Sequence, residues 1–306
     1  MRYRPFGRSG ITTSAIALCL TDAAARKGGD HVQALVFAAL EAGINAYHIA
    51  GVDPVLPEAL GRALSVLERN LVFVSMHAGI ARGRVGLTRD FSPEALTLSI
   101  DQALNASGLG HIDLITLDNP GSEELPRASL ETLKAIRASG RISLLGVAGD
   151  NDAMDAYVSA NAFDVLVTPY HLRSGWKERN RLKEAVGLDM GVVAYGFFPE
   201  ELSTAKKADD LAGQKRGLFG LGKSRDDSPL QGMGTYAFLH QTPNWTAEEV
   251  CLAYALTEPS LSTILVESVD PAHLAALAAI PDRDMPPGLA AQVEMARFGP
   301  AAAKSA

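Results

Sequence analysis

Short apolar runs alternate with longer amphipathic stretches along most of this sequence. Each run is continuous rather than interrupted by polar residues, which is typical of strands buried on both faces of a parallel sheet. Between the runs, apolar residues recur at the spacing of an α-helix. We predict strands at Ile16–Leu20, Ala46–Ile49, Leu71–Met76, Ile112–Leu117, Ile142–Val147, Val165–Val167, Gly191–Ala194 and Thr263–Val266.

The amphipathic stretches carry helix start and stop signals. Asp30 is placed to cap a helix that Gly43 ends, and Pro57 begins the next one. The predicted helices are Asp30–Gly43, Pro57–Leu67, Ser92–Ser107, Pro126–Ser139, Asp152–Ala160, Lys177–Val186, Thr246–Thr257 and Pro271–Ala279. Eight strands, each followed by a helix, predict an α/β fold, a parallel (β/α)8 TIM barrel. An open doubly wound sheet is disfavoured because residues 17–22 (ALCLTD) contain no G-x-G-x-x-G motif.

Three segments lie outside this repeat. Residues 2–14 alternate around a Gly-Arg-Ser-Gly turn and predict an N-terminal β-hairpin. Residues 199–244 follow the seventh strand and lack periodicity, so they predict a long loop on the rim where barrels carry their sites. Residues 281–306 predict a C-terminal tail. We therefore expect one barrel domain over residues 1–306.

Composition narrows the classes of protein that are possible. The chain has 306 residues, of which 47% are hydrophobic, and a formal charge of −7, which disfavours nucleic-acid and anionic-membrane partners. No apolar run reaches the ~18 residues that a transmembrane helix needs. Its two cysteines exclude a disulfide framework, and the polar start predicts no secretory signal. We expect a cytoplasmic protein.

Several segments resemble the aldo/keto reductase family. Residues 45–64 (NAYHIAGVDPVLPEALGRAL) follow the family's D-T-A-D-V-Y-G-x-S-E-E-L-L-G-R-A-L without a gap. Residues 111–120 (HIDLITLDNP) are similar to Y-I-D-L-L-Q-L-H-N-P, and residues 191–199 (GVVAYGFFP) to G-V-V-A-Y-S-P-L. The resemblance covers most of residues 1–280 and implies the family's barrel.

The resemblance does not extend to the catalytic residues. The family reduces carbonyl groups with a nicotinamide hydride, and its tyrosine donates the proton with help from an aspartate, a lysine and a histidine. Carried over by position, the aspartate is His48, the tyrosine is Asp53 and the histidine is Asp118. The lysine falls on His77, or on Met76 if the alignment shifts by one residue. General acid catalysis contributes ~10²–10⁴-fold to the rate of a reaction. Because the family's proton-donating tyrosine is replaced, the resemblance implies that conventional carbonyl reduction is disfavoured.

The resemblance also implies a changed cofactor site. If NADP(H) binds, the positions that would hold it include Thr168, Tyr195 and Ser268. Tyr195 retains the family's residue, whereas Thr168 stands where the family has glutamine. Glu267 replaces a glycine of the phosphate loop and puts a negative charge near the place of a pyrophosphate.

Three functions stay open at this point. The first is a non-catalytic relative that binds a small molecule at the barrel mouth, or a protein partner through loop 199–244. The second is a repurposed enzyme in which His48, His77 and Asp118 bind a divalent metal or act as acid–base groups, with Asp53 assisting. The third is a residual NADP(H)-dependent oxidoreductase. Residues 217–224 (GLFGLGKS) match a P-loop, but neither a strand before them nor a helix after them supports nucleotide binding.

Overall fold

The structure is a computed structural model, and it describes residues 1–204 and 236–298. The chain divides into two compact units. The first comprises Met1–Pro169, Gly175–Tyr195 and Pro259–Asp282, and the second comprises Tyr170–Ser174, Gly196–Glu258 and Arg283–Ala306. The single domain expected from the sequence stays a prediction.

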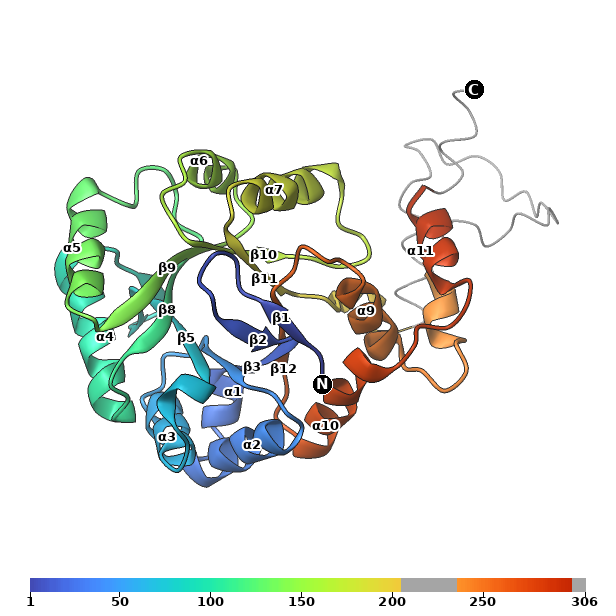
Figure 1. Cartoon of the computed structure of the whole chain (residues 1–306), viewed down its shortest axis with the longest axis horizontal. Coiled ribbons are helices and arrows are strands. Elements are labelled where there is room, and N and C mark those ends of the chain that lie inside the picture. Colours follow the sequence, from blue (N-terminus) through green and yellow to red (C-terminus); the bar gives the residue numbers. More distant parts are fainter. Residues whose placement is uncertain (205–235, 299–306) are drawn as a thin grey trace. The chain divides into compact units, whose positions relative to one another are not determined.

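The first unit contains a closed barrel of eight parallel strands, which confirms the predicted fold (Figure 1). Around the barrel the strands follow the order β10-β11-β12-β3-β4-β5-β8-β9. Their bounds are β3 Ile16–Leu20, β4 Ala46–Ile49, β5 Phe73–Ala78, β8 Ile112–Asp118, β9 Ile142–Ala148, β10 Val165–Pro169, β11 Gly191–Tyr195 and β12 Thr263–Glu267. They are almost entirely buried, as expected of strands covered by helices outside and side chains inside.

Helices follow the strands and surround the barrel in Figure 1. The first unit contains α1 Asp22–Ala25, α2 Gly29–Glu41, α3 Val55–Leu64, α4 Pro93–Ser107, α5 Arg127–Ala138, α6 Ala153–Ser159, α7 Trp176–Gly187 and α10 Pro271–Ala279, with short helices η1 Arg69–Leu71 and η4 Ile280–Asp282. Ser92 caps α4 by accepting a hydrogen bond from the Ala95 N–H, and Asp270 does the same for Ala272 at the start of α10. Asp30, expected as a cap, lies instead in the first turn of α2.

The predicted N-terminal hairpin is also confirmed. It consists of β1 (Tyr3–Pro5) and β2 (Thr12–Ser14), paired antiparallel. Its turn places Phe6 inside the barrel, where the Phe6 ring lies 4.6 Å from the ring of Phe73 on β5. This aromatic contact fills the barrel at the end where its strands begin.

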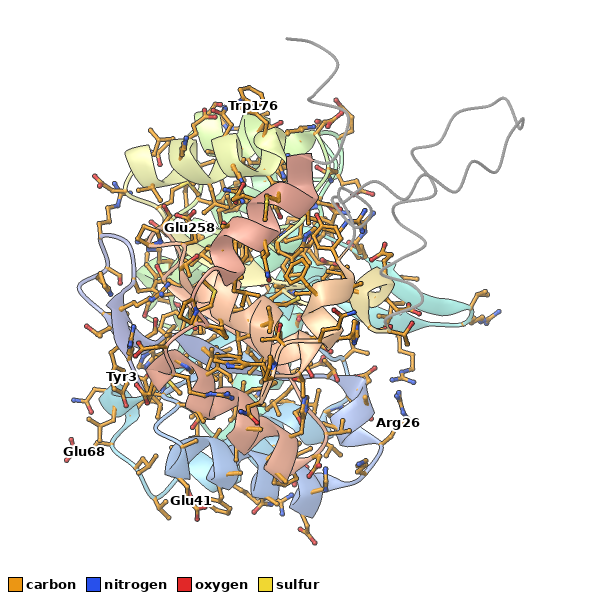
Figure 2. All side chains as sticks on the ribbon, turned by 90° about the vertical axis from the view of Figure 1, so that its right-hand side faces the viewer. Tyr3, Arg26, Glu41, Glu68, Trp176 and Glu258 are labelled. Atoms are coloured by element: carbon orange, nitrogen blue, oxygen red, sulfur yellow. The ribbon has the colours of Figure 1, made fainter. Side chains whose placement is uncertain are left out.

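A second hairpin was not predicted. Strands β6 (Ile80–Gly83) and β7 (Gly86–Arg89) form an antiparallel pair directly after β5. In Figure 2 this teal hairpin stands out from the barrel at the end away from Tyr3. Since β5 ends there, the hairpin belongs to the rim formed by the carboxyl ends of the strands.

The second unit contains helices η2 Glu200–Leu202, η3 Ala237–His240, α9 Ala247–Leu256 and α11 Leu289–Phe298. Helix α9 begins with a capping box in which Thr246 and Glu249 bond to each other's backbone N–H. Helix α11 lies within residues 281–306, the segment predicted as a C-terminal tail, and the extent of that tail stays a prediction. Residues 205–235, which include most of the predicted rim loop and the P-loop-like motif, lie outside the described residues. Within the described ranges, no helix has the length and apolar character that crossing a membrane requires.

Candidate functional site

Strand alternation decides which side chains enter the barrel. The interior cluster contains Ala46 on β4, Phe73 on β5 and Leu114 on β8. Because side chains of a strand alternate between its faces, His48 is the next inward position on β4. On the same basis β5 contributes Ser75 and His77 in turn, and β8 contributes Thr116 and Asp118. Met76, the other candidate for the lysine position, faces outward.

The structure brings His48 and His77 together inside the barrel. Their Nε2 atoms are 3.3 Å apart, and their rings meet edge to face with centroids separated by 4.6 Å. His48 Nδ1 lies 2.8 Å from the Ser75 hydroxyl, and His77 Nδ1 lies 2.8 Å from the Thr116 hydroxyl. All four ring nitrogens are therefore engaged in one chain of four side chains, which we call the histidine chain.

The histidine chain has restricted protonation patterns. Each contact needs one hydrogen, and the Nε2–Nε2 contact needs it on only one of the two nitrogens. If the Ser75 hydroxyl donates to His48, then His48 Nε2–H donates to His77 and His77 Nδ1–H donates to Thr116. The reverse direction is also complete, beginning with donation from Thr116. In both patterns the two imidazoles are neutral and carry their hydrogens on different nitrogens.

Backbone carbonyls lie at each end of the histidine chain. The Thr116 hydroxyl is 3.1 Å from the Met76 oxygen, and the Ser75 hydroxyl is 3.2 Å from the Tyr47 oxygen. In each pattern one of the two hydroxyls, Ser75 or Thr116, donates to a histidine. The other hydroxyl is free to donate to the backbone carbonyl beside it. The chain is thus satisfied without any group from outside the barrel.

Burial keeps both imidazoles neutral. Only 2% of His48 is exposed. Desolvation, reinforced by His77, holds the pKa of His48 well below its ordinary value. Desolvation also lowers the pKa of His77, against an opposing attraction from Asp118. The burial effect therefore agrees with the neutral hydrogen-bond patterns.

Asp53 takes part in a different set of contacts. Its Oδ1 accepts a hydrogen bond of 3.0 Å from the Val55 N–H at the start of α3. Its own N–H donates to Asp22 Oδ1 at 3.2 Å, and the Val52 N–H donates to the same oxygen at 2.9 Å. Asp53 therefore stabilises the loop between β4 and α3, and the histidine chain does not include it.

Other polar groups at the strand ends lack such contacts. Within the described part of the chain, no residue donates a hydrogen bond or forms an ion pair with the carboxylate of Asp118, Asp150 or Glu267. The Tyr195 hydroxyl has no hydrogen-bond partner there either. Burial, with the charges of Asp150 and Asp118, raises the pKa of Tyr195 to about 12. These four side chains are available at the barrel mouth.

The candidate cofactor positions fall into different environments. Tyr195 follows the inward-facing Val193 by two residues on β11, so it faces the interior. Thr168 comes one residue after the inward-facing Val167, so alternation turns it toward the helices, and its buried hydroxyl has no partner among the described residues. Ser268 lies after β12, where its hydroxyl is 3.0 Å from His273 Nδ1 and accepts from the Asp270 N–H at 3.0 Å. The three positions do not form one open surface.

The structure brings together two of the three side chains that the metal hypothesis requires. His48 and His77 meet, but Asp118 does not complete a group with them. In the part of the chain that can be described, no three His, Cys, Asp or Glu side chains are arranged to hold a metal ion. A metal at these residues stays a prediction.

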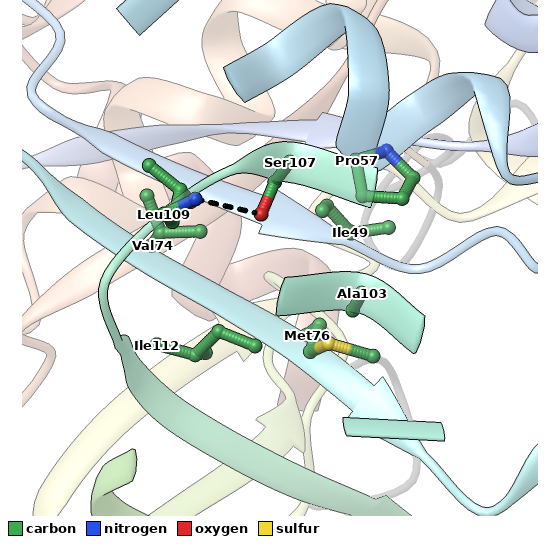
Figure 3. A pocket seen from close by; sticks show the side chains of 8 residues that line it. All are labelled: Ile49, Pro57, Val74, Met76, Ala103, Ser107, Leu109 and Ile112. Atoms are coloured by element: carbon green, nitrogen blue, oxygen red, sulfur yellow. Dashed lines mark hydrogen bonds between the residues drawn. The ribbon is translucent and has the colours of Figure 1, made fainter. Parts of the chain in front are cut away.

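A small cavity lies outside the barrel wall and is unrelated to the mouth (Figure 3). Its lining is almost entirely apolar: Ile49, Pro57, Val74, Met76, Ala103, Ser107, Leu109 and Ile112. The single hydroxyl, that of Ser107, accepts a hydrogen bond from the Leu109 N–H at 3.3 Å. This cavity between strands and helices is a packing gap.

Comparison with known proteins agrees with this fold. The sequence pattern of the aldo/keto reductase family matches residues 20–287, and the chain belongs to that family. A holo-form aldo-keto reductase structure from Bacillus halodurans has a TM-score of 0.74 at 16% identity, covering 96% of this chain and 95% of that one. The glycerol dehydrogenase of Gluconobacter oxydans gives 0.68 at 18% identity, covering 95% and 94%. At these identities the structures support the barrel fold alone.

A further similarity is more limited. Over 133 residues the chain is 35% identical to a dihydroorotate dehydrogenase (quinone) from Anaeromyxobacter dehalogenans. The match involves 37% of this chain and 35% of the relative's length. It therefore covers about a third of each protein and does not define a shared site.

Proposed function

We propose that this aldo/keto reductase family member binds a small molecule at its barrel mouth and does not perform nicotinamide-dependent carbonyl reduction. The observation that carries the proposal is the closed histidine chain. A proton donor or metal ligand needs a nitrogen facing the bound molecule, and His48 and His77 use all of theirs within the barrel. The buried polar groups at this site thus stabilise each other rather than a reacting carbonyl.

The role of Asp53 supports the same proposal. A general acid must reach the oxygen that it protonates, within about 3 Å. The Asp53 carboxylate instead accepts the Val55 N–H at the start of α3, two residues further along the chain, which is an Asx-turn. Asp53 therefore substitutes poorly for the family's tyrosine.

The end of β12 provides independent support against a phosphate-bearing cofactor. Free N–H groups at a helix N-terminus attract phosphate. At α10 the Asp270 carboxylate already accepts the Ala272 N–H at 3.0 Å, and Ser268 is engaged with Asp270 and His273. Glu267 and Asp118, which pair with no described residue, add negative charge on the same rim. Among the described residues, these groups argue against the phosphates of NADP(H) and favour a neutral or cationic ligand.

A repurposed enzyme is the second candidate. The observation in its favour is the contact of 3.3 Å between His48 and His77, near the carboxylate of Asp118, which pairs with no described residue. It requires the histidine chain to open so that a ring nitrogen is released. Elemental analysis of the purified protein, with and without added zinc, iron and manganese, tests its metal form.

The proposal is tested by titrating the protein with NADPH and NADH while following thermal unfolding and the oxidation of NADPH by 4-nitrobenzaldehyde. A ligand at 100 times its Kd adds ~2.7 kcal/mol to stability. We expect no such stabilisation and no oxidation above the protein-free rate. Saturable stabilisation together with turnover that is lost in Asp53→Asn would instead support the residual oxidoreductase.

A matched control restores the family pattern at four positions: His48→Asp, Asp53→Tyr, His77→Lys and Asp118→His. This variant, assayed with the same aldehyde, reports whether the barrel can support reduction at all. A gain of NADPH oxidation in the variant, and none in the natural chain, attributes the difference to these four side chains.

A further inference from the structure

The unpredicted hairpin β6–β7 is attached directly to the candidate site. It begins three residues after His77, and its last residue, Arg89, donates to the backbone oxygen of Asp118 at 3.4 Å. Val85 at its tip is fully exposed and Leu87 is 62% exposed. An isolated two-stranded hairpin is marginally stable in water. Contacts with the rim must therefore hold it in place.

Two arginines on the same face of the hairpin supply those contacts. Arg82 pairs with Leu87 and Ile80 pairs with Arg89 across the two strands, so alternation puts Arg82 and Arg89 on one face. Arg82 Nη2 lies 2.8 Å from Asp22 Oδ2, beyond the end of β3. Arg89 Nη1 donates to the Asn119 oxygen at 2.7 Å, beyond the end of β8. The hairpin is held from two sides of the rim.

Asp22 connects the hairpin to a second rim segment. One of its oxygens meets Arg82, and the other accepts the N–H groups of Val52 and Asp53. This approach needs a glycine at position 51, because a Cβ there would lie 2.4 Å from Asp22 Oδ1. Asp22, the first residue of α1, therefore joins that helix to the β4–α3 loop and to the hairpin.

We propose that hairpin β6–β7 is a gate for the ligand site and that the Arg82–Asp22 ion pair is its latch. The proposal rests on the proposed function in one respect, namely that the mouth is where the ligand binds. Opening the latch frees the hairpin from the β3 side of the rim and widens access to Tyr195 and Asp118. Arg89 keeps the hairpin attached on the β8 side and acts as the hinge.

The contacts that Arg82 and Arg89 make with the rim differ in strength. The Arg82 side chain is 64% exposed and, among the residues that the structure describes, pairs only with Asp22. Arg89 reaches two backbone oxygens, those of Asp118 and Asn119, and also the Glu124 carboxylate at 3.4 Å. Exposed ion pairs are weak and are screened by salt. The Arg82 end is thus the one that opens.

Hydrogen exchange followed by mass spectrometry tests the latch in the full-length protein. In Arg82→Gln we expect exchange over residues 80–89 to rise about two- to fivefold, as expected from the loss of one partly exposed ion pair. Asp22→Asn keeps an oxygen for the β4–α3 loop, so only the hairpin should exchange faster. Asp22→Ala should accelerate residues 51–56 as well. Arg62→Gln, which breaks the exposed Arg62–Glu58 pair on α3, is the control and should change neither segment.

Access to the mouth is measured separately with tetranitromethane, which nitrates accessible tyrosines. We expect Arg82→Gln to raise the nitration rate of Tyr195 by about two- to fivefold, while Tyr3, on β1, keeps its rate. High salt should have the same effect on the natural chain. Unchanged exchange over residues 80–89, or faster exchange without faster Tyr195 nitration, overturns the gate. Neither readout involves NADPH or a bound ligand, so failure here is distinct from failure of the proposed function.

Discussion

The two ends of the barrel use charged residues in opposite ways. At the end where the strands begin, Asp113 Oδ2 accepts bonds of 2.5 Å from Arg69 and 2.7 Å from the Val74 N–H, and its Oδ1 lies 3.3 Å from His111. Asp164, just before β10, likewise accepts Arg137 at 2.9 Å. These carboxylates join neighbouring segments of the barrel.

At the opposite end, carboxylates in comparable positions are unpaired. Asp118, Asp150 and Glu267 receive no hydrogen bond from any described residue, while the neutral histidine chain is closed beneath them. In barrels of this type, stability residues gather where the strands begin and functional residues gather where they end. The contrast teaches that burial alone does not identify a site: the informative feature is a polar group that the fold leaves without a partner.

The largest loss of stability is expected at the end of the barrel where the strands begin. Asp113→Ala leaves the Arg69 guanidinium, whose side chain is 21% exposed, without its main partner. Losing one member of a buried pair typically costs ~3–5 kcal/mol, and partial exposure places this variant near the lower limit. Urea unfolding of Asp113→Ala and Asp118→Ala measures the contrast. Equal destabilisation of the two variants would remove the distinction between the ends.

Two buried threonines provide a sharper comparison of bonded and unbonded hydroxyls. Thr116→Val removes the partner of His77 Nδ1 and should cost ~1–3 kcal/mol, the penalty for a buried polar atom left unsatisfied. Thr168→Val removes a hydroxyl that has no partner among the described residues, so it should be neutral or stabilising. The same urea series checks both. A larger loss for Thr168→Val would contradict the contacts assigned to the histidine chain.

Stability should also depend on pH through the two histidines. Their pKa values are lowered in the folded chain, whereas unfolded histidine has its ordinary value of 6.5. Below about pH 6.5 the unfolded state therefore binds more protons than the folded state. As the pH is lowered further, the free energy of unfolding falls by up to ~1.4 kcal/mol per pH unit for each histidine. The double variant His48→Gln, His77→Gln should lose this part of the slope. An unchanged slope between pH 7.5 and 5.5 would show that other groups cause it.

The smallest change in the free energy of unfolding is expected at the barrel mouth. Asp118→Asn removes a charge that pairs with no described residue, so the free energy of unfolding should change by less than ~0.5 kcal/mol. Asp150→Asn should behave in the same way. A loss of several kcal/mol in either variant would mean that these carboxylates are structural, as Asp113 is.

The sequence predicted the barrel well because its strands are buried on both faces and read as continuous apolar runs. It also predicted that His48, His77 and Asp118 lie near the same end, since each falls at the end of a strand. It could not predict that the imidazoles face each other, because that depends on strand register and on hydroxyls at Ser75 and Thr116.

Other features could not be predicted because they depend on contacts between residues that are distant in the sequence. Hairpin β6–β7 has short strands with glycines, Gly83 and Gly86, at its turn, which is a weak but readable hairpin signal. Its position depends on ion pairs with distant segments. The role of Asp22, which reaches a loop 30 residues further along the chain, had no signal in the sequence.

The histidine chain is tested most directly by 1H–15N correlation spectroscopy of the imidazole nitrogens at pH 7.5. The three contacts of the chain predict two neutral rings of unlike tautomer, one protonated on Nδ1 and the other on Nε2. Assignment is made by comparison with His48→Gln and His77→Gln. An imidazolium at either position, or two rings of the same tautomer, would contradict the closed chain and return His48 and His77 to the candidates for catalysis or metal binding.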